Sequence, residues 1–411
     1  MAALAQDATP ESVGMSSERL ARLDTHFQRY LDDGRLPGWQ ISVARRGKVV
    51  HHSLRGARDL ASGAPVEADT IWRIFSMTKP ITAVLALQLW EEGAFELNDP
   101  VHRYIPSFEH TRVWRSGSVT APVLEPITET LRLWQLFAHT SGLTYGFMYN
   151  HPVDELYRRA GFEWGSPAGC NLEGVCDVLA GLPLLFQPGS EWNYSMGLDV
   201  LGRVLEVVSG QPLDELMRTR LLHPLGMHET TWHVPEAHHS RLASLYGAHP
   251  TTRQAVPLEQ MGQAAKHPPA FLGGGGGLQS TAYDYHRFTQ MLANGGELDG
   301  VRILSPRTVR YMASNHLPNN ADLTAFGRPL FSETTFDGVG FGLGVSVTLD
   351  PVAGRVPGNA GEFAWGGAAS TAFWVDPADE LVVQFFTQLL PSSVHPIRSQ
   401  LKQLVYQAML D

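Results

Sequence analysis

The sequence predicts an α+β fold in which an antiparallel sheet is flanked by helices from the two ends of the chain, with a mainly helical region inserted. Three observations predict it. A helix pattern and two strand patterns open the chain, three strand patterns and a helix pattern close it, and prolines and glycines interrupt the long middle part. We therefore expect an α/β domain built from residues 1–90 and 271–411, a mainly helical domain over 91–270, and an active site between them.

The first predicted element is an amphipathic helix that begins near Ser16. Ser16 or Ser17 can cap it, because a serine side chain accepts a hydrogen bond from the free N–H groups of the first turn. Apolar residues at three- and four-residue spacings form one stripe, made of Leu20, Leu23, Phe27 and Leu31. The alternation around Ile41 and Val43, followed by a β-rich run over 49–54, then predicts two antiparallel strands.

A second helix is predicted from Ser76 to about Glu91. Its apolar residues lie on more than one face, which is typical of a helix buried in the core. Pro80 lacks an N–H group and fits only in the first turn of such a helix. The sequence therefore places Ser76 at a helix N-terminus, where free N–H groups and the positive end of the helix dipole lie.

The C-terminal part predicts three strands and a last helix. The segments 339–349, 369–375 and 381–389 have the composition of strands, and turn residues over 376–379 join the last two as a meander. One face of the terminal helix is built by Ile397, Leu401, Leu404, Val405 and Ala408.

The glycine run Gly273 to Gly277 resembles a phosphate-binding loop only in its glycine content. A phosphate loop continues with Gly-Lys-Ser or Gly-Lys-Thr, and this chain does not. We expect a tight turn instead, placed before a helix that Thr281 and Asp284 open as a capping box.

Composition argues against several classes of function. The chain has 411 residues, of which 43% are hydrophobic and 18% charged, so it can bury a core; its formal charge of −10 disfavours nucleic acid as a partner. No run of about 18 apolar residues predicts a membrane span. The first residues, MAALAQDATP, lack the pattern of a secretory signal, so we expect a cytoplasmic protein. We expect a monomer or a small homo-oligomer.

Neither the cysteines nor the clustered histidines predict a metal or a cofactor. Cys170 and Cys176 do not have a zinc or redox spacing, so we expect ordinary thiols, with a local disulfide as the alternative. His223, His228 and His233 recur every five residues, and this spacing does not place them on one helix face.

The tetrad Ser76-Met77-Thr78-Lys79 carries the chemistry. Its Ser-x-x-Lys form puts the hydroxyl and the amine on one face of a helix. A serine hydroxyl is a weak nucleophile, and a buried lysine can accept or relay its proton. N–H groups at the helix N-terminus favour the oxyanion of acyl transfer. A second match, Ser399 to Lys402, falls in the terminal helix, where we expect both side chains to face water.

Other motifs single out Ser76 rather than Ser399. They are Gln187-Pro188-Gly189, Trp192-Asn193-Tyr194-Ser195-Met196, Trp365-Gly366-Gly367-Ala368, His139-Thr140-Ser141-Gly142-Leu143, Pro224-Leu225-Gly226-Met227 and Gly340-Phe341-Gly342-Leu343-Gly344. With this order of motifs, the chain resembles the family VIII carboxylesterases, which share the fold of class C β-lactamases and D-alanyl-D-alanine peptidases. The resemblance covers roughly residues 10 to 410 and implies a β-lactamase/transpeptidase-like fold.

The resemblance also implies roles for individual residues. Ser76 would be acylated, Lys79 would hold its proton, and Tyr194 would act as partner base and later activate the deacylating water, with the lysine and tyrosine titrating as a pair. The N–H groups of Ser76 and Ala368 would form the oxyanion hole. The substrate pocket would include Trp365, Gly366, Gly367, Tyr145 and Trp192. The two glycines would let their strand approach the acyl group, and His139 would belong to a structural turn.

Two departures from the β-lactamase pattern favour an esterase. Met196 stands where those enzymes commonly carry asparagine, and Trp365 begins the triad that is Lys-Thr-Gly in them. An ammonium suits a substrate carboxylate, whereas an indole offers apolar area and one N–H donor. The sequence thus predicts hydrolysis of neutral short- to medium-chain esters, without a cofactor. Three alternatives stay open: an acyltransferase that uses the same acyl-enzyme, a β-lactamase or D-Ala-D-Ala peptidase-like enzyme with weak β-lactam hydrolysis, and an idle binding protein.

Overall fold

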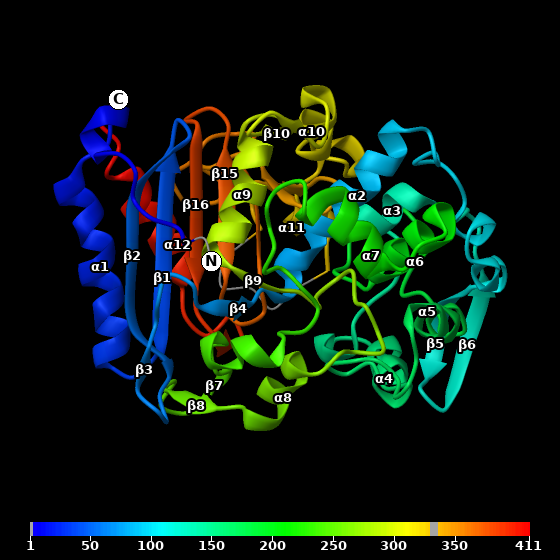
Figure 1. Cartoon of the computed structure of the whole chain (residues 1–411). Helices are drawn as coiled ribbons and strands as arrows, with labels where there is room; N and C mark the ends of the chain where they lie inside the picture. The colour runs from blue at the N-terminus through cyan, green and yellow to red at the C-terminus, as the bar shows by residue number, and fades with distance from the viewer. Residues whose placement is uncertain (1–2, 329–335) are drawn as a thin grey trace.

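An eight-stranded antiparallel sheet forms the centre of the α/β part of the molecule (Figure 1). The computed structural model describes residues 3–328 and 336–411. The strand order is β12-β13-β14-β15-β16-β1-β2-β3, so the first and last thirds of the chain meet where β1 pairs with β16. The strands are β1 (Gly38–Arg45), β2 (Lys48–Asp59), β3 (Ala64–Pro65), β12 (Val339–Phe341), β13 (Ser346–Thr348), β14 (Phe363–Gly366), β15 (Ala372–Asp376) and β16 (Leu381–Phe386).

Helices cover both faces of this sheet. Helices α1 (Ser17–Asp32) and α12 (Ile397–Tyr406) pack on one face, where they bury Phe385. Helix α9 (Ala282–Ala293) packs on the other face, which the adjacent Phe386 enters because successive strand residues point to opposite sides. The α+β fold predicted from the sequence is thus confirmed.

The remaining helices and short strands build the half of the molecule beside the sheet and the loops between the two. The helices are α2 (Thr78–Glu91), α3 (Leu133–Phe137), α4 (Pro152–Arg159), α5 (Leu172–Ala180), α6 (Gly197–Ser209), α7 (Leu213–Met217), α8 (Glu259–Gln263), α10 (Pro306–Met312) and α11 (Leu323–Phe326). The strands are β4 (Ile71–Arg73), β5 (Arg112–Ser118), β6 (Ala121–Pro126), β7 (Tyr246–Ala248), β8 (Ala255–Pro257), β9 (Gln279–Thr281), β10 (Glu297–Leu298), β11 (Val301–Arg302) and β17 (Leu389–Leu390). Where the domains divide stays a prediction. None of the described helices is long and apolar enough to cross a membrane.

The N-terminal caps of the first and ninth helices are the ones predicted from the sequence. The Ser16 hydroxyl accepts a hydrogen bond from the Arg19 N–H at 3.3 Å and caps α1, and the Thr281 hydroxyl caps α9 in the same way through Asp284. In α1 the buried stripe ends with Tyr30, because Leu31 is only partly buried.

The C-terminal strands are shorter than predicted because the chain leaves the strand conformation within each predicted segment. Segment 339–349 forms two strands instead of one, because Gly344 adopts a φ of 87° and the Gly342 N–H closes a turn onto the Val345 carbonyl. Strand β15 starts only at Ala372, since 367–371 form a turn. The run 381–389 is likewise interrupted after Phe386, and β17 pairs with β7 instead.

Candidate active site

Ser76 lies in a 3₁₀ turn (Phe75–Met77) that leads into α2. Pro80 is the third residue of α2, so the helix tolerates it, and Ser76 precedes the first turn as predicted from the sequence. Phe75 has a φ of 43°, a conformation that costs a non-glycine residue roughly 1 kcal/mol or more. This strained residue turns the chain sharply and leaves Ser76 partly exposed.

Lys79 is fully buried one turn further along α2. Its Nζ donates to the Ser76 hydroxyl at 3.3 Å and to the carbonyl of Gly275 at 2.6 Å. The same ammonium lies 4.5 Å from the ring centre of Tyr194 and 5.2 Å from that of Tyr145. The lysine therefore touches the serine and faces two aromatic rings.

Tyr194 reaches Ser76 from the segment that precedes α6. Its hydroxyl donates to the Ser76 hydroxyl at 2.6 Å, and its side chain is 5% exposed. The structure thus brings together Ser76, Lys79 and Tyr194, as expected from the motifs.

His139 and Trp192 pack against the Tyr194 ring, and neither lines the two cavities next to Ser76. The His139 ring packs edge-on against Tyr194 at 4.9 Å, and its Nδ1 pairs with the Ser195 hydroxyl at 2.9 Å. Burial, followed by the charge of Lys79, holds the pKa of His139 well below its ordinary value, so the ring is neutral. Trp192 is fully buried in the same aromatic cluster and lines neither cavity next to Ser76.

The end of β14 brings Ala368 beside Ser76. A turn closed by the Gly367 N–H on the Thr371 carbonyl, at 2.9 Å, follows the strand. A Cβ on Gly366 would lie 2.7 Å from the backbone carbonyl oxygen of Thr371, and one on Gly367 would lie 2.5 Å from that of Ile74. The two glycines are therefore required first by close packing within the protein, a reason different from the substrate approach that the sequence suggests.

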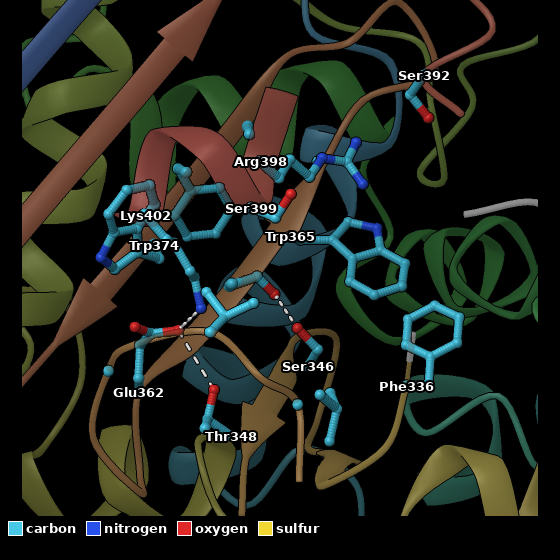
Figure 2. A pocket seen from close by; sticks show the side chains of 18 of the residues that line it. Phe336, Ser346, Thr348, Glu362, Trp365, Trp374, Ser392, Arg398, Ser399 and Lys402 are labelled. Atoms are coloured by element: carbon cyan, nitrogen blue, oxygen red, sulfur yellow. Dashed lines mark hydrogen bonds and ion pairs between the residues drawn. The ribbon is translucent and has the colours of Figure 1, made fainter. Parts of the chain in front are cut away.

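Two cavities meet at Ser76. The larger has a volume of about 510 Å³ and is lined by Tyr145 among other residues; the smaller has about 180 Å³ and is lined by Tyr194 and Trp365. Ser76, Phe147 and Ala368 line both. Figure 2 shows the smaller cavity, with Trp365 near Phe336 on one side and the paired Glu362 and Lys402 on the other.

Asp199 and Gly275 belong to the site although no motif marks them. Asp199 is a buried carboxylate on α6, and it accepts the Gly275 N–H at 2.8 Å, while the carbonyl of the same glycine accepts from Lys79. Burial raises the pKa of the Asp199 carboxyl; the charge of Lys79 and the Gly275 N–H oppose this rise. The five-glycine run is thus a turn, as predicted, but one that connects Lys79 to a buried carboxylate.

Replacing Gly275 with alanine is expected to lower kcat about 10- to 100-fold, because displacing a positioning group by an ångström has effects of this size. The added Cβ would lie 2.4 Å from Oδ2 of Asp199 and 3.0 Å from the Tyr145 hydroxyl. Gly276→Ala is the matched control, since its Cβ meets no atom closer than 4.0 Å. Steady-state kinetics on an activated ester checks this. Equal losses in the two variants would contradict the role given to Gly275.

The second Ser-x-x-Lys match differs from the sequence prediction. Lys402 does not face water: it forms an ion pair with Glu362, a carboxylate with no exposed surface, while its own side chain is 20% exposed. The Ser399 hydroxyl donates to the Pro396 carbonyl at 3.2 Å. Leaving the buried Glu362 carboxylate without a cation costs more free energy than Lys402 would gain from full hydration at the surface.

Lys402→Met is expected to lower the free energy of unfolding by about 2–3 kcal/mol, because it leaves the Glu362 carboxylate buried without its cation. Gln403→Met, on an exposed position of the same helix, is the matched control and should change stability by less than about 0.5 kcal/mol. Urea denaturation of both variants measures the difference. Equal stabilities would show that the pair contributes nothing.

The cysteines and the spaced histidines hold no further site. Cys170 and Cys176 are free thiols. The rings of His223 and His228 lie 5.2 Å apart, and within residues 3–328 and 336–411 no group of three or more His, Cys, Asp or Glu side chains is arranged to hold a metal ion.

Known proteins match this chain and its fold over nearly their whole length. A family model described as Beta-lactamase matches residues 23–407. Esterase EstB of Burkholderia gladioli is 32% identical, with 99% of this chain and 100% of that protein covered, and the lovastatin esterase of Penicillium rubens is 29% identical over 87% and 90%. The structure of EstCE1, a hydrolase with promiscuous acyltransferase activity, matches with a TM-score of 0.80 at 28% identity, over 95% and 99% of the two chains.

The fold and these relatives define a serine hydrolase that works through an acyl-enzyme. The chain belongs to the beta-lactamase family. The resemblance to the family VIII carboxylesterases, expected from the motifs, is confirmed.

Proposed function

We propose that the protein is a carboxylesterase that hydrolyses neutral esters with short to medium acyl groups through an acyl-enzyme at Ser76. The observation that carries the proposal is the contact of one serine hydroxyl with both Lys79 and Tyr194, at a point where two cavities meet. The names of EstB and the lovastatin esterase support an ester as the substrate class.

Acylation begins with proton transfer between the two hydroxyls that lie 2.6 Å apart. When Tyr194 is ionised, the Ser76 hydroxyl donates to the phenolate, and the nearby Lys79 ammonium stabilises that charge. Ser76 Oγ then attacks the ester carbonyl. The N–H groups of Ser76 and Ala368 stabilise the oxyanion, and Tyr194 returns the proton to the leaving alcohol as the C–O bond breaks.

Deacylation runs through the same groups in the reverse sense. A water molecule takes the place of the departed alcohol, Tyr194 accepts its proton, and hydroxide attacks the acyl carbonyl. The Ser76 oxygen leaves and regains a proton from Tyr194, so the free acid and the resting enzyme result.

The environment of Trp365 supports a neutral substrate. Its ring packs on Tyr194 with centroids 5.5 Å apart, so the wall next to the proton-transfer pair is an indole face. Among the described residues, the Trp365 Nε1 has no hydrogen-bond partner and almost no accessible surface, so the part of the indole that lines the cavity is hydrocarbon. Trp365 itself offers no charge to a substrate carboxylate, and the described residues that line this cavity bring two cations, Arg398 and the Glu362-paired Lys402.

Acyl transfer to an alcohol is the second candidate function. The smaller cavity is lined by Tyr194, so an acceptor alcohol bound there can deliver its proton as water does. The described promiscuity of EstCE1 supports this candidate. Product analysis with an added primary alcohol separates the two, because a transferase gives a new ester in excess of free acid.

The central experiment uses an alkyl fluorophosphonate, which traps serine nucleophiles covalently. Intact mass spectrometry should show one adduct per chain, mapped to Ser76, and the protein should hydrolyse p-nitrophenyl butanoate faster than a chromogenic cephalosporin. An adduct on another serine would overturn the assignment of the nucleophile. Faster turnover of the cephalosporin would favour a β-lactamase.

A further inference from the structure

Three stacked rings line the larger cavity, and the middle one, Phe147, also lines the smaller. The rings of Tyr145 and Phe147 lie 4.6 Å apart at an interplanar angle of 17°, and those of Phe147 and Trp164 lie 4.8 Å apart at 16°. Tyr145 is next to the reacting groups, with its ring 5.2 Å from that of Tyr194, whereas Trp164 is 49% exposed. The stack therefore runs from the reaction centre to the mouth of the larger cavity, which Trp164 lines.

The stack is held in place by the packing of the chain around it. Phe162, two residues before Trp164, is buried, and its carbonyl would lie 2.2 Å from a Cβ at Gly146. The segments that carry Phe147 and Trp164 thus touch through their backbones, and only a glycine permits that contact. The Tyr149 hydroxyl donates a hydrogen bond to the Glu163 carboxylate. The position of Trp164 is fixed by these neighbours, although its side chain is half exposed.

The chemistry distinguishes the two cavities. The leaving alcohol and the incoming water both exchange a proton with Tyr194, so both pass on the side of the carbonyl that Tyr194 faces. Tyr194 lines only the smaller cavity. During deacylation the acyl group must leave the side facing Tyr194 open for water. The larger cavity, which Ser76 and Ala368 also line, is the other space next to the acylated serine.

The larger cavity has the size and lining of a site for a bulky apolar group. Its 510 Å³ lie within the range of about 300–1,000 Å³ that is typical of sites for drug-sized ligands. Apolar side chains from distant segments surround it, among them Met196, Trp232, Met261 and Phe271. A two-carbon acyl group would leave most of this space empty and would not reach Trp164.

We infer that the larger cavity binds the acid part of the ester and that Trp164 is a specificity-determining residue, which selects ring-bearing apolar acyl groups by stacking. This inference rests on the proposed esterase function. A planar ring that continues the stack can contact only Trp164 face to face, because Tyr145 and Trp164 already cover the two faces of Phe147. Such a contact between aromatic rings contributes about 0.5–1.5 kcal/mol beyond its buried area.

The test compares two p-nitrophenyl esters with the same leaving group, the 2-naphthylacetate and the acetate. The wild type should have the higher kcat/KM for the naphthylacetate. Trp164→Ala should lower the ratio of the kcat/KM value for the naphthylacetate to that for the acetate about 5- to 10-fold, and Trp164→Phe should keep most of the ratio. Leu60→Ala, at an equally exposed apolar residue of the turn between β2 and β3, should leave the ratio unchanged.

The outcomes separate the inference from the function on which it rests. If the enzyme is active and Trp164→Ala leaves the naphthylacetate-to-acetate ratio of kcat/KM unchanged, only the inference is overturned. An equal loss on both esters also overturns it, because it would indicate a structural role. A second pair, ethyl acetate and 2-naphthylethyl acetate, varies only the alcohol. A Trp164→Ala effect confined to this pair would overturn the assignment of acid and alcohol to the two cavities. A wild type that hydrolyses none of these esters would refute the esterase function itself.

Discussion

Ser76→Ala is expected to lower kcat/KM for an activated ester at least about 10⁴-fold, because the described part of the chain places no other hydroxyl within reach of both Lys79 and Tyr194. The residual rate would come from the oxyanion N–H groups and from binding, both of which the substitution leaves in place. Steady-state hydrolysis of p-nitrophenyl butanoate measures the loss. Thermal unfolding should change little, since the substitution removes one partly exposed hydroxyl.

The chain offers its own control for this loss, because Ser399 begins the second Ser-x-x-Lys match. Fluorophosphonate labelling should disappear in Ser76→Ala and persist in Ser399→Ala. The Ser399 hydroxyl of the wild type donates to the carbonyl of Pro396, just before its helix, and Lys402 is paired with Glu362. Undiminished ester turnover in Ser76→Ala would contradict the acyl-enzyme proposed here.

Local patterns in the sequence predicted those parts of the fold that depend on neighbours along the chain. The cap at Ser16, the all-round apolar surface of α2 and the place of Pro80 in its first turn each follow from residues within one or two helical turns. The split of 339–349 into two strands was missed because a glycine in a β-rich run does not show by itself that it turns the chain.

The site was predictable where its residues sit in motifs, and not where it depends on contacts between distant segments. Ser76 and Lys79 are three residues apart, but Asp199 and Gly275 are separated by 76 residues and Gly275 and Lys79 by 196. No spacing rule connects residues so far apart. The same reason explains Lys402, whose partner Glu362 lies 40 residues earlier and draws it inward.

Aromatic residues were the least predictable part of the pocket, because a tyrosine or tryptophan serves the core as well as a substrate. The sequence predicts both Tyr145 and Trp192 in the substrate pocket. In the structure Tyr145 lines the larger cavity, whereas Trp192 is buried in the cluster that packs against Tyr194. Trp164, which the sequence does not mark at all, stands at the mouth. What decides between these positions is the packing of helices and loops that meet only in the folded chain.

Tyr194→Phe is the second large effect: kcat should fall about 10²- to 10⁴-fold, the range expected when a positioned proton-transfer group is lost. The ring and its contacts with His139 and Trp365 are kept, while the hydroxyl that hydrogen-bonds to Ser76 is removed. Both half-reactions use this hydroxyl, so stopped-flow measurements should show slow acylation as well as slow deacylation.

Tyr145→Phe is the matched control, because it removes a phenolic hydroxyl from the neighbouring ring without touching Ser76. Burial, the charge of Asp199 and the proximity of Tyr194 raise the pKa of Tyr145 well above its ordinary value, so it stays protonated and cannot replace the base. We expect a loss below about 10-fold. Equal losses in the two variants would show that both hydroxyls act only through packing or polarity. Tyr194 would then not be the group that moves the proton between Ser76, the leaving alcohol and water.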